Sequence, residues 1–392
     1  MKISTNAYRV LCVTNESDLP ETELFIRLKK AGIDMEVACN PKGRYFDRLK
    51  ASEVPIHELV TTSRFSMQSI RKIRLLLSRR HYDILYCFNN KATSNVLLAT
   101  RGENYRIMTY RGTVGNISFL SPSSWTTHLN PRVDRIVCVS NAVREYLLAM
   151  RFLGLCLRPE RAVTIYKGHD LSWYQSKPIN LSAEFKLPEN AFVVGFAGKN
   201  RPLKGVNFLV DAARHLPGKA PIYFLLIGDR LRENRSLHQQ IASSPYADRI
   251  YLTGFRSDAP AIIGACDAFI MPSIKREGLS KAVIEAMSYA TTPIVTEAGG
   301  LPELVENGHS GIVTPPCNAR AIAAAIMQLY ENPIKTREMG ENARERIRNI
   351  FNIDKTVEQT RQLFEQLVAS DQKTVLPVDW RIANAPRIIS QA

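Results

Sequence analysis

The sequence predicts an α/β protein with two doubly wound parallel sheets, and three observations support this prediction. At 392 residues, the chain is long enough for two domains of ordinary size. Short apolar runs recur along it, each followed by a stretch long enough for a helix, which is the pattern of βαβ units. Two similar series of such runs are separated by the polar segment 172–190, which contains Pro178 and Pro188 and suits a linker. We therefore expect domains at 1–175 and 176–392.

Each expected strand is rich in Val, Ile, Leu or aromatic residues and is closed by Gly, Asn, Asp or Pro, which commonly end strands. In the first half these strands fall near residues 9–14, 35–39, 84–88, 106–110, 135–140 and 163–166. In the second half they fall near residues 192–197, 222–227, 249–252, 268–271, 293–296 and 311–313. Ligands of such folds bind beyond the carboxyl ends of the strands, so we expect a ligand cleft between the two domains.

The composition is that of a folded soluble protein, with 45% apolar and 23% charged residues. No apolar run approaches the ~20 residues that span a bilayer, and Met1 is not followed by the apolar stretch of a secretory signal. The seven cysteines are scattered and form no Cys-x-x-Cys pair, so they indicate free thiols in a reducing compartment. We expect a cytoplasmic protein.

The charge is unusual in its size and in its distribution. The formal net charge is +15, and residues 1–170 carry 26 basic against 15 acidic side chains, so the first half holds most of the excess. Such a field favours an anionic partner, which could be a nucleic acid, a phosphorylated substrate or an anionic membrane face. Charge alone does not choose among them.

The most informative segment is 272–287, which follows an expected strand and contains Glu277 and Glu285 with seven residues between them. Ser280 is a candidate N-cap, so a helix beginning there would present free backbone N–H groups to an anion. Glu285 would lie about a turn and a half into that helix, while Glu277 would lie in the preceding loop. The two carboxylates would therefore meet different parts of one extended ligand, as suits sugar and ribose hydroxyls.

Two further loops follow expected strands. The loop 198–205 concentrates the cations of Lys199, Arg201 and Lys204, which could clamp a diphosphate. Gly299 and Gly300 mark a place where backbone must approach a neighbour or a ligand closely. The spacing is neither that of a Walker P-loop nor that of a Gly-x-Gly-x-x-Gly dinucleotide fingerprint.

These motifs occur in the order Gly198…Lys204-Gly205, Gly254-Phe255, Glu277-x7-Glu285 and Gly299-Gly300. Together they resemble the nucleotide-sugar domain of retaining glycosyltransferases of family 4, which have the GT-B architecture of two Rossmann-like domains facing a central cleft. The resemblance is close over roughly 190–350. In the first half it is confined to the strand pattern. It also implies a C-terminal helix, at about 354–375, that crosses back to the first domain.

The resemblance implies a role for each matching residue. Lys204 would neutralise the donor diphosphate, Glu285 would bind the nucleotide ribose, and Glu277 would contact the transferred sugar on its reacting face. The remaining donor contacts would come from the backbone N–H groups of Gly278, Leu279 and Ser280 and, around the nucleobase, from Gly254, Phe255 and Arg256. Basic side chains and a helix N-terminus would act on the leaving diphosphate, so the family normally needs no metal and no cofactor.

The sequence departs from the family pattern at several positions. Lys199 stands where the family usually has Arg, and Arg201 follows two residues later, so either could supply the second charge. Arg111 stands where members commonly have a histidine. It would then face the reacting sugar as a catalytic residue, or be paired with a local carboxylate. The acceptor side is therefore divergent.

A basic amphipathic segment runs from Ser66 to His81. Its apolar residues fall on one helical face, and no acidic residue occurs between Glu58 and Asp83. It is either an ordinary surface helix that packs on the first sheet or a membrane-surface helix that holds the protein on anionic lipid beside a lipid-linked acceptor.

The sequence thus predicts a metal-independent retaining hexosyltransferase of cell-surface polysaccharide or lipopolysaccharide biosynthesis. It would use a nucleotide-sugar donor and a saccharide or lipid-linked acceptor, in the cytoplasm or peripherally on the inner membrane face. A nucleotide-sugar epimerase of similar fold is one alternative. A nucleic-acid binder is the other, although no aromatic-and-basic RNA motif or zinc ligand set supports it, so we expect no nucleic-acid partner.

Overall fold

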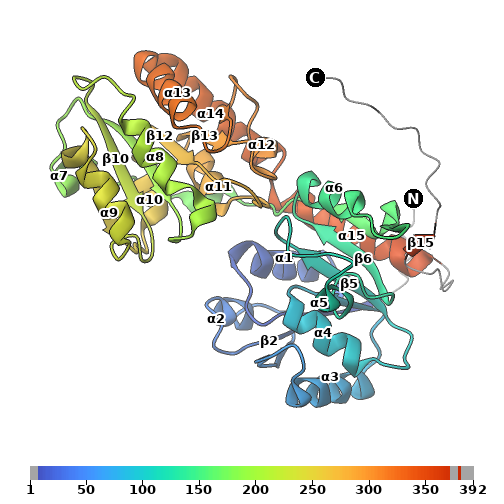
Figure 1. Cartoon of the computed structure of the whole chain (residues 1–392). Coiled ribbons are helices and arrows are strands. Elements are labelled where there is room, and N and C mark those ends of the chain that lie inside the picture. The colour runs from blue at the N-terminus through green and yellow to red at the C-terminus, as the bar shows by residue number, and fades with distance from the viewer. Residues whose placement is uncertain (1–7, 371–377, 381–392) are drawn as a thin grey trace. The chain divides into compact units, whose positions relative to one another are not determined.

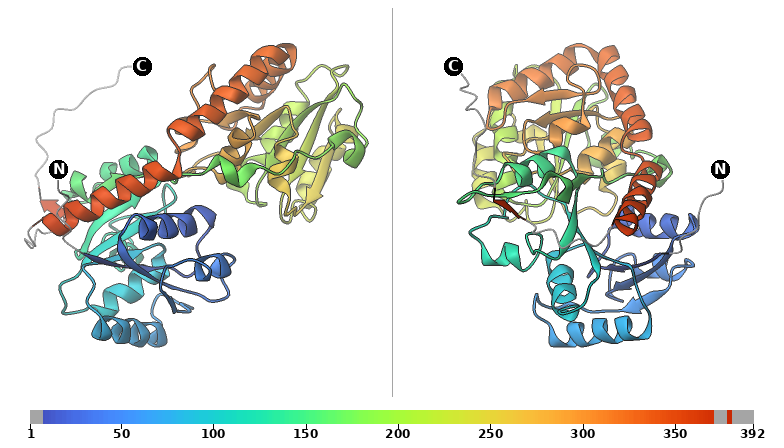
Figure 2. Two further views of the ribbon diagram at one scale, coloured as in Figure 1. Left: turned by 180° about the vertical axis from the view of Figure 1, so that it is seen from behind. Right: turned by 90° about the vertical axis from the view of Figure 1, so that its right-hand side faces the viewer.

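A computed structural model describes residues 8–370 and 378–380 of the chain. Contacts between Cα atoms divide it into two units, the first formed by Met1–Tyr166 and Thr356–Ala392 and the second by Lys167–Lys355. In each unit, helices cover both faces of a sheet (Figures 1 and 2). Among the described helices, none is both long enough and apolar enough to cross a bilayer.

The first unit contains a seven-stranded parallel sheet in the order β3-β2-β1-β4-β5-β6-β8. Its strands are β1 (Arg9–Val13), β2 (Asp34–Cys39), β3 (Ile56–Glu58), β4 (Ile84–Cys87), β5 (Arg106–Arg111), β6 (Val133–Cys138) and β8 (Ala162–Thr164). Its helices are α1 (Leu19–Lys30), α2 (Phe46–Lys50), α3 (Met67–Arg79), α4 (Asn90–Ala99), α5 (Pro122–Trp125) and α6 (Asn141–Ala149). A separate antiparallel pair joins β7 (Leu155–Leu157) to β15 (Val378–Trp380).

The second unit contains a six-stranded parallel sheet in the order β11-β10-β9-β12-β13-β14. Its strands are β9 (Phe192–Ala197), β10 (Ile222–Ile227), β11 (Ile250–Gly254), β12 (Ala268–Met271), β13 (Thr292–Thr296) and β14 (Ile312–Thr314). Its helices are α7 (Leu181–Phe185), α8 (Val206–Ala213), α9 (Arg235–Ala242), α10 (Ala259–Ile263), α11 (Lys281–Ser288), α12 (Leu301–Leu304), α13 (Ala319–Glu331) and α14 (Pro333–Asn349).

Helix α15 (Ile353–Ala369) returns the chain to the first unit, to which it belongs from Thr356 onward. The Thr356 hydroxyl donates a hydrogen bond of 2.8 Å to the carbonyl of Tyr166. Further along the helix, the buried ring of Phe364 makes an edge contact with Tyr86 of β4, with ring centroids 6.1 Å apart. The end of the first half and the end of the chain therefore share one core. Residues 371–375 of the expected helix lie outside the described residues.

The expected parallel sheets are present, with local differences from the prediction. The first unit ends at Tyr166, not at residue 175, because the backbone of His169 is bonded within the second unit, donating to Phe351 and accepting from Ile353. The segment expected to be a linker contains the short helix α7. Strand β3 was not predicted, because its sequence Ile-His-Glu carries a single apolar residue.

Candidate active site

The loop after β9 contacts the loop after β12 through backbone atoms. Gly205 has a left-handed φ of +66°, and a Cβ there would lie 2.0 Å from the carbonyl oxygen of Pro272. The backbone N–H of Ile274 donates to the carbonyl of Leu203 at 2.9 Å. The two backbones are therefore in direct contact, and glycine is required where they cross.

This contact brings together two of the predicted donor-site residues. The Lys204 ammonium lies 2.6 Å from Oε1 of Glu277, and the Ser273 hydroxyl donates to the same oxygen at 2.9 Å. The side chains of Lys204 and Glu277 are 23% and 16% exposed, so the pair is largely shielded but still reachable by a ligand. Lys204 and Glu277 are 73 positions apart in the sequence, and the crossing of the two loops places them side by side.

The paired glycines after β13 hold the backbone of Glu277. The N–H of Gly300 donates to the Glu277 carbonyl at 3.1 Å, and a Cβ on Gly299 would lie 2.1 Å from that same oxygen. Arg276, directly before Glu277, has a left-handed φ of +66°, which is unfavourable for a residue with a side chain. The close approach expected at these glycines is therefore an approach to the glutamate loop.

Helix α11 begins beside this loop with Ser280 at its N-cap position. Ser280 is buried and extended, as expected of an N-cap, but its side chain makes no capping hydrogen bond. The first turn of α11 contains no acidic residue, so its positive end is available to an anion. Gly278 and Leu279 lead into this end of the helix.

Glu285 lies on α11 and is 9% exposed. Its Oε1 forms an ion pair with the Lys281 ammonium, at a distance of 3.1 Å. Glu285 and Glu277 are thus supplied by one helix and by the loop that leads into it, as the spacing of the two glutamates predicted.

The other predicted donor residues are either more exposed than Lys204 and Glu277 or bonded to other side chains. Lys199 and Arg201 are both exposed on the loop after β9, and Phe255 is 74% exposed. The Arg256 guanidinium is held by two carboxylates, with bonds of 2.7 and 2.6 Å to Asp258 and a further bond to Glu184. Hydrogen bonds to these carboxylates raise the pKa of Arg256 above its ordinary value. The structure therefore surrounds Glu277 and Lys204 more tightly than it does the segment 254–256.

Two side chains of this region were not predicted from the sequence. Ser273 donates to Glu277, and the only signal for it is a small polar residue shortly after a buried strand. Arg232 lies against Gly254, whose φ is +73°, and donates to the carbonyl of Leu252 at 2.9 Å. It follows no expected strand directly, so no pattern marked it.

Arg111 belongs to the first unit and ends β5. It is 8% exposed, donates to the carbonyl of Gly115, and has a buried Nε without a hydrogen-bond partner. Burial lowers the pKa of its guanidinium. Of the described residues, none pairs a carboxylate with Arg111, so the alternative of a local carboxylate partner is wrong for this part of the chain. Within residues 8–370 and 378–380, no cluster of three or more His, Cys, Asp or Glu side chains is placed to hold a metal.

Comparison with known families matches both halves of the chain. The family model described as "Glycosyl transferases group 1" matches residues 179–346, and the model described as "Glycosyltransferase Family 4" matches residues 22–173. The two matches cover the second sheet and most of the first. They agree with the motifs that predicted the family.

Two relatives illustrate the range of matching proteins. An uncharacterised glycosyltransferase of Methanocaldococcus jannaschii is 28% identical over 242 residues, covering 60% of this chain and 59% of the relative. This chain therefore spans about three fifths of that protein's length. An Escherichia coli UDP-Gal:alpha-D-GlcNAc-diphosphoundecaprenol alpha-1,3-galactosyltransferase is 24% identical over 321 residues, covering 78% of this chain and 80% of the relative.

Solved structures share the architecture. A glycosyltransferase from Rickettsia africae has a TM-score of 0.78 at 20% identity and covers 93% of this chain and 100% of its own. Anabaena HepE in complex with UDP has a TM-score of 0.74 at 22% identity and covers 92% of this chain and 100% of its own. With two doubly wound sheets and matches to both family models, the chain belongs to the group 1 glycosyltransferases of family 4 and has the GT-B fold.

Proposed function

We propose that this glycosyltransferase moves a sugar, with retention of configuration, from a nucleotide-diphosphate sugar to a hydroxyl group of a saccharide or glycolipid. The observation that carries the proposal is the Lys204–Glu277 pair at 2.6 Å, in which Glu277 lies in the loop leading to the uncapped N-terminus of α11. A cation and a helix N-terminus stabilise a departing diphosphate, and a carboxylate beside them suits a sugar at its reacting face.

Each residue has a distinct part in the proposed transfer. Lys204 and the backbone N–H groups of Gly278–Ser280 bind the diphosphate, with Lys199 or Arg201 adding a second charge. Glu285 binds the ribose, and residues 254–256 flank the base. The bond from the sugar C1 to the phosphate oxygen breaks while a bond from C1 to the acceptor oxygen forms on the same face, beside Glu277. The proton of the acceptor hydroxyl passes to the departing phosphate oxygen. No metal ion is required in this scheme, because the cations named neutralise the diphosphate.

The relatives suggest which substrates to examine first. HepE binds UDP and UDP-glucose in solved structures, and the E. coli relative is named for a diphosphoundecaprenol acceptor. These names support a UDP-sugar donor and a lipid-linked acceptor, in the biosynthesis of cell-surface polysaccharide or lipopolysaccharide. We propose that this activity takes place on the cytoplasmic side of a membrane.

The experiment is a titration of UDP and UDP-sugars into the full chain, followed by assay of the best donor with and without acceptor. Lys204→Ala should weaken UDP binding and transfer by about tenfold or more, since loss of a charge-assisted hydrogen bond costs roughly 1.5–3 kcal/mol. The exposed Lys219 provides the matched control, and Lys219→Ala should behave as the wild type. Wild-type turnover should survive EDTA. Unchanged UDP binding in Lys204→Ala, or strict dependence on a divalent metal, contradicts the proposal.

We also propose that α3 rests on anionic lipid. One face of the helix buries Ile70 and Ile73 in the first unit, whereas Met67 and Leu75 are 60% and 50% exposed. Arg71, Lys72 and Arg79 are exposed with them. Exposed apolar side chains flanked by cations are typical of a helix that lies in a membrane interface.

A further inference from the structure

Arg111 carries a buried positive charge that no carboxylate in the described part of the chain neutralises. Its hydrogen bond goes to a neutral carbonyl, that of Gly115, and its Nε has no partner. Among residues 8–370 and 378–380, no carboxylate lies within ion-pair distance of its guanidinium. Burying an uncompensated charge is costly, so such a group usually has a partner. The described residues therefore leave a place for an anionic ligand beside Arg111.

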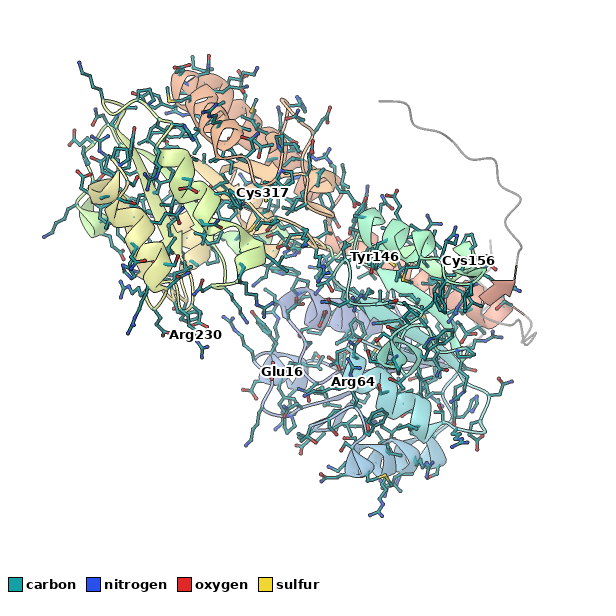
Figure 3. All side chains as sticks on the ribbon, in the orientation of Figure 1. Glu16, Arg64, Tyr146, Cys156, Arg230 and Cys317 are labelled. Carbon is teal, nitrogen blue, oxygen red and sulfur yellow. The ribbon has the colours of Figure 1, made fainter. Side chains whose placement is uncertain are left out.

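A second cation, Arg64, lies on a loop of the first unit whose backbone is held by α4. The loop that carries it is tied to α4, because Asn95 donates to the carbonyl of Ser63 at 2.8 Å and accepts from the N–H of Ser66 at 2.9 Å. Arg64 is half-buried, and no ion pair joins it to a described residue. Arg64 is labelled among the side chains of the first unit in Figure 3.

His128 joins β5, which ends at Arg111, to α4, to which the loop that carries Arg64 is bonded. Its Nδ1 lies 3.0 Å from the Thr109 hydroxyl, two residues before Arg111 on β5, and its Nε2 lies 3.0 Å from Oδ1 of Asn90, at the start of α4. Burial, and then the charges of Arg111 and Arg64, lower the pKa of His128 to about 3. The imidazole is therefore neutral at neutral pH. The first turn of α4 also contains no acidic residue.

We propose that Arg111 and Arg64 bind the phosphate group of a phosphorylated acceptor at the carboxyl edge of the first sheet. This inference rests on the proposed function, because it names the acceptor class of that transferase. Two guanidinium groups match a phosphate monoester, which carries a charge of about −1.5 to −2 at pH 7, whereas one would suffice for a carboxylate. The planar fork of arginine also suits phosphate oxygens.

The test is calorimetric titration of inorganic phosphate into the full chain in the presence of saturating UDP, which occupies the proposed diphosphate site of the second unit. The wild type should bind phosphate. Arg111→Gln should abolish this binding, and Arg64→Gln should weaken it about tenfold, the loss expected for one charge-assisted contact. Arg101→Gln, an exposed arginine of the same unit, is the matched control and should bind as the wild type.

The competing explanation is that Arg111 only supports the loop that contains Gly115. In that case Arg111→Gln lowers the melting temperature, but Arg64→Gln leaves phosphate affinity unchanged, which overturns the proposal. If Arg111→Gln does not fold, the half-buried Arg64 decides the question. Failure to bind UDP contradicts the proposed function, whereas UDP binding without phosphate binding overturns this inference alone.

A second pair of titrations distinguishes two sources of the phosphate. Glucose 6-phosphate is compared with glucose, and a polyprenyl phosphate in detergent micelles is compared with the corresponding alcohol. If each phosphorylated compound binds more tightly than its unphosphorylated counterpart, and Arg111→Gln removes this difference in affinity, the inference is supported. The series with the larger difference in affinity identifies a soluble or a lipid-linked acceptor. No gain in either series overturns it.

Discussion

The carboxylate of Glu277 is fixed by several independent contacts. Lys204 and Ser273 bind its Oε1, while Gly300 binds its backbone carbonyl. The preceding residue, Arg276, adopts a left-handed conformation that costs energy and persists because its neighbours hold it. Such over-determined placement is typical of a group that must meet a ligand in one geometry.

Glu277→Gln should abolish transfer while leaving the affinity for UDP within about threefold of the wild type. The amide retains the volume of the carboxylate but loses the charge beside the reacting carbon, and UDP lacks the sugar that Glu277 is proposed to contact. Calorimetry with UDP and a transfer assay measure the two effects. Glu297→Gln, an exposed residue of the loop that holds Glu277, is the control. Equal loss of UDP affinity and of turnover would place Glu277 on the nucleotide.

At this scale the sequence predicted the arrangement of Glu277 and Glu285, but not the contact between Lys204 and Glu277. The position of Glu277 and Glu285 around a helix start follows from their spacing, because one helix and its leading loop supply both. The meeting of Lys204 with Glu277 depends on two loops crossing at Gly205, which no local pattern contains. The buried, unpaired state of Arg111 is likewise a property of its surroundings and not of its own sequence segment.

At the scale of elements, a buried glutamate on β2 joins β3 and the segment after α3 at the edge of the first sheet. Glu36 on β2 accepts hydrogen bonds of 2.5 Å from the Tyr82 hydroxyl and from His57 of β3, and it pairs with Arg80, which follows α3. Burial alone would raise the pKa of Glu36. The hydrogen bonds from His57 and Tyr82 and the charge of Arg80 outweigh this effect and lower the pKa below its ordinary value of 4.5.

A lowered carboxyl pKa predicts how the stability of the first unit depends on pH. The stabilisation from Glu36 should be fully present above about pH 4.5 and should be lost as the pH falls through the lower folded-state value. Glu36→Gln should cost about 1–3 kcal/mol at pH 7 and weaken this acid dependence. Urea unfolding at several pH values measures both effects. Glu53→Gln, on an exposed side chain, should change neither, and an unchanged acid profile in Glu36→Gln would contradict the assignment.

The exposed face of α3 allows a sharper test of membrane binding. Arg74 donates to the carbonyls of Leu98 and Ala99, and Arg80 pairs with Glu36, so both are engaged by the protein. Arg71, Lys72 and Arg79 are exposed cations of the helix that make no hydrogen bond or ion pair with a described side chain. Only these three should be changed if the fold is to be kept.

Replacing Arg71, Lys72 and Arg79 by Gln should release the protein from vesicles that contain anionic lipid. Each cation near such a surface contributes on the order of 1 kcal/mol, and salt weakens the attraction. Co-sedimentation at several salt concentrations measures binding, and UDP affinity serves as the check on folding. Three exposed basic residues of the second unit, Lys219, Arg235 and Lys335, changed together to Gln form the matched control. Vesicle binding equal to that of the wild type would show that α3 is an ordinary surface helix.

The elements themselves were predicted with uneven success, for physical reasons. Strands β9, β10 and β12 occupy their predicted bounds, because each is a buried apolar run between residues that end strands. The central strands of both sheets also make polar contacts with residues distant in the sequence. Asp83 accepts from the N–H of Arg9 at the start of β1, and Asp267 accepts from the N–H of Val193 in β9, each at 2.7 Å. In both units an aspartate carboxylate thus accepts a hydrogen bond from a strand N–H, and this contact forms only in the folded chain.

At the scale of the whole molecule, the first unit is formed by two separate stretches of the chain, and the second unit by the single stretch between them. The first unit is completed by the segment after Thr356, whereas the second is continuous from Lys167 to Lys355. The first unit therefore cannot finish its core until the second has been synthesised. The residues of the proposed donor site all belong to the continuous unit, so we expect that site not to depend on this step.

This arrangement predicts that Phe364→Ala destabilises the first unit without weakening donor binding. Phe364 is fully buried and contacts the rings of Tyr8 and Tyr86, so its removal should cost about 3–5 kcal/mol. Calorimetric melting should show the first unit unfolding earlier, while UDP raises the melting temperature of the second unit as in the wild type, because a ligand stabilises the state that binds it. The exposed Ile334 of the second unit is the control, and Ile334→Ala should leave both transitions in place. Loss of UDP binding in Phe364→Ala would mean that the two units fold as one cooperative body.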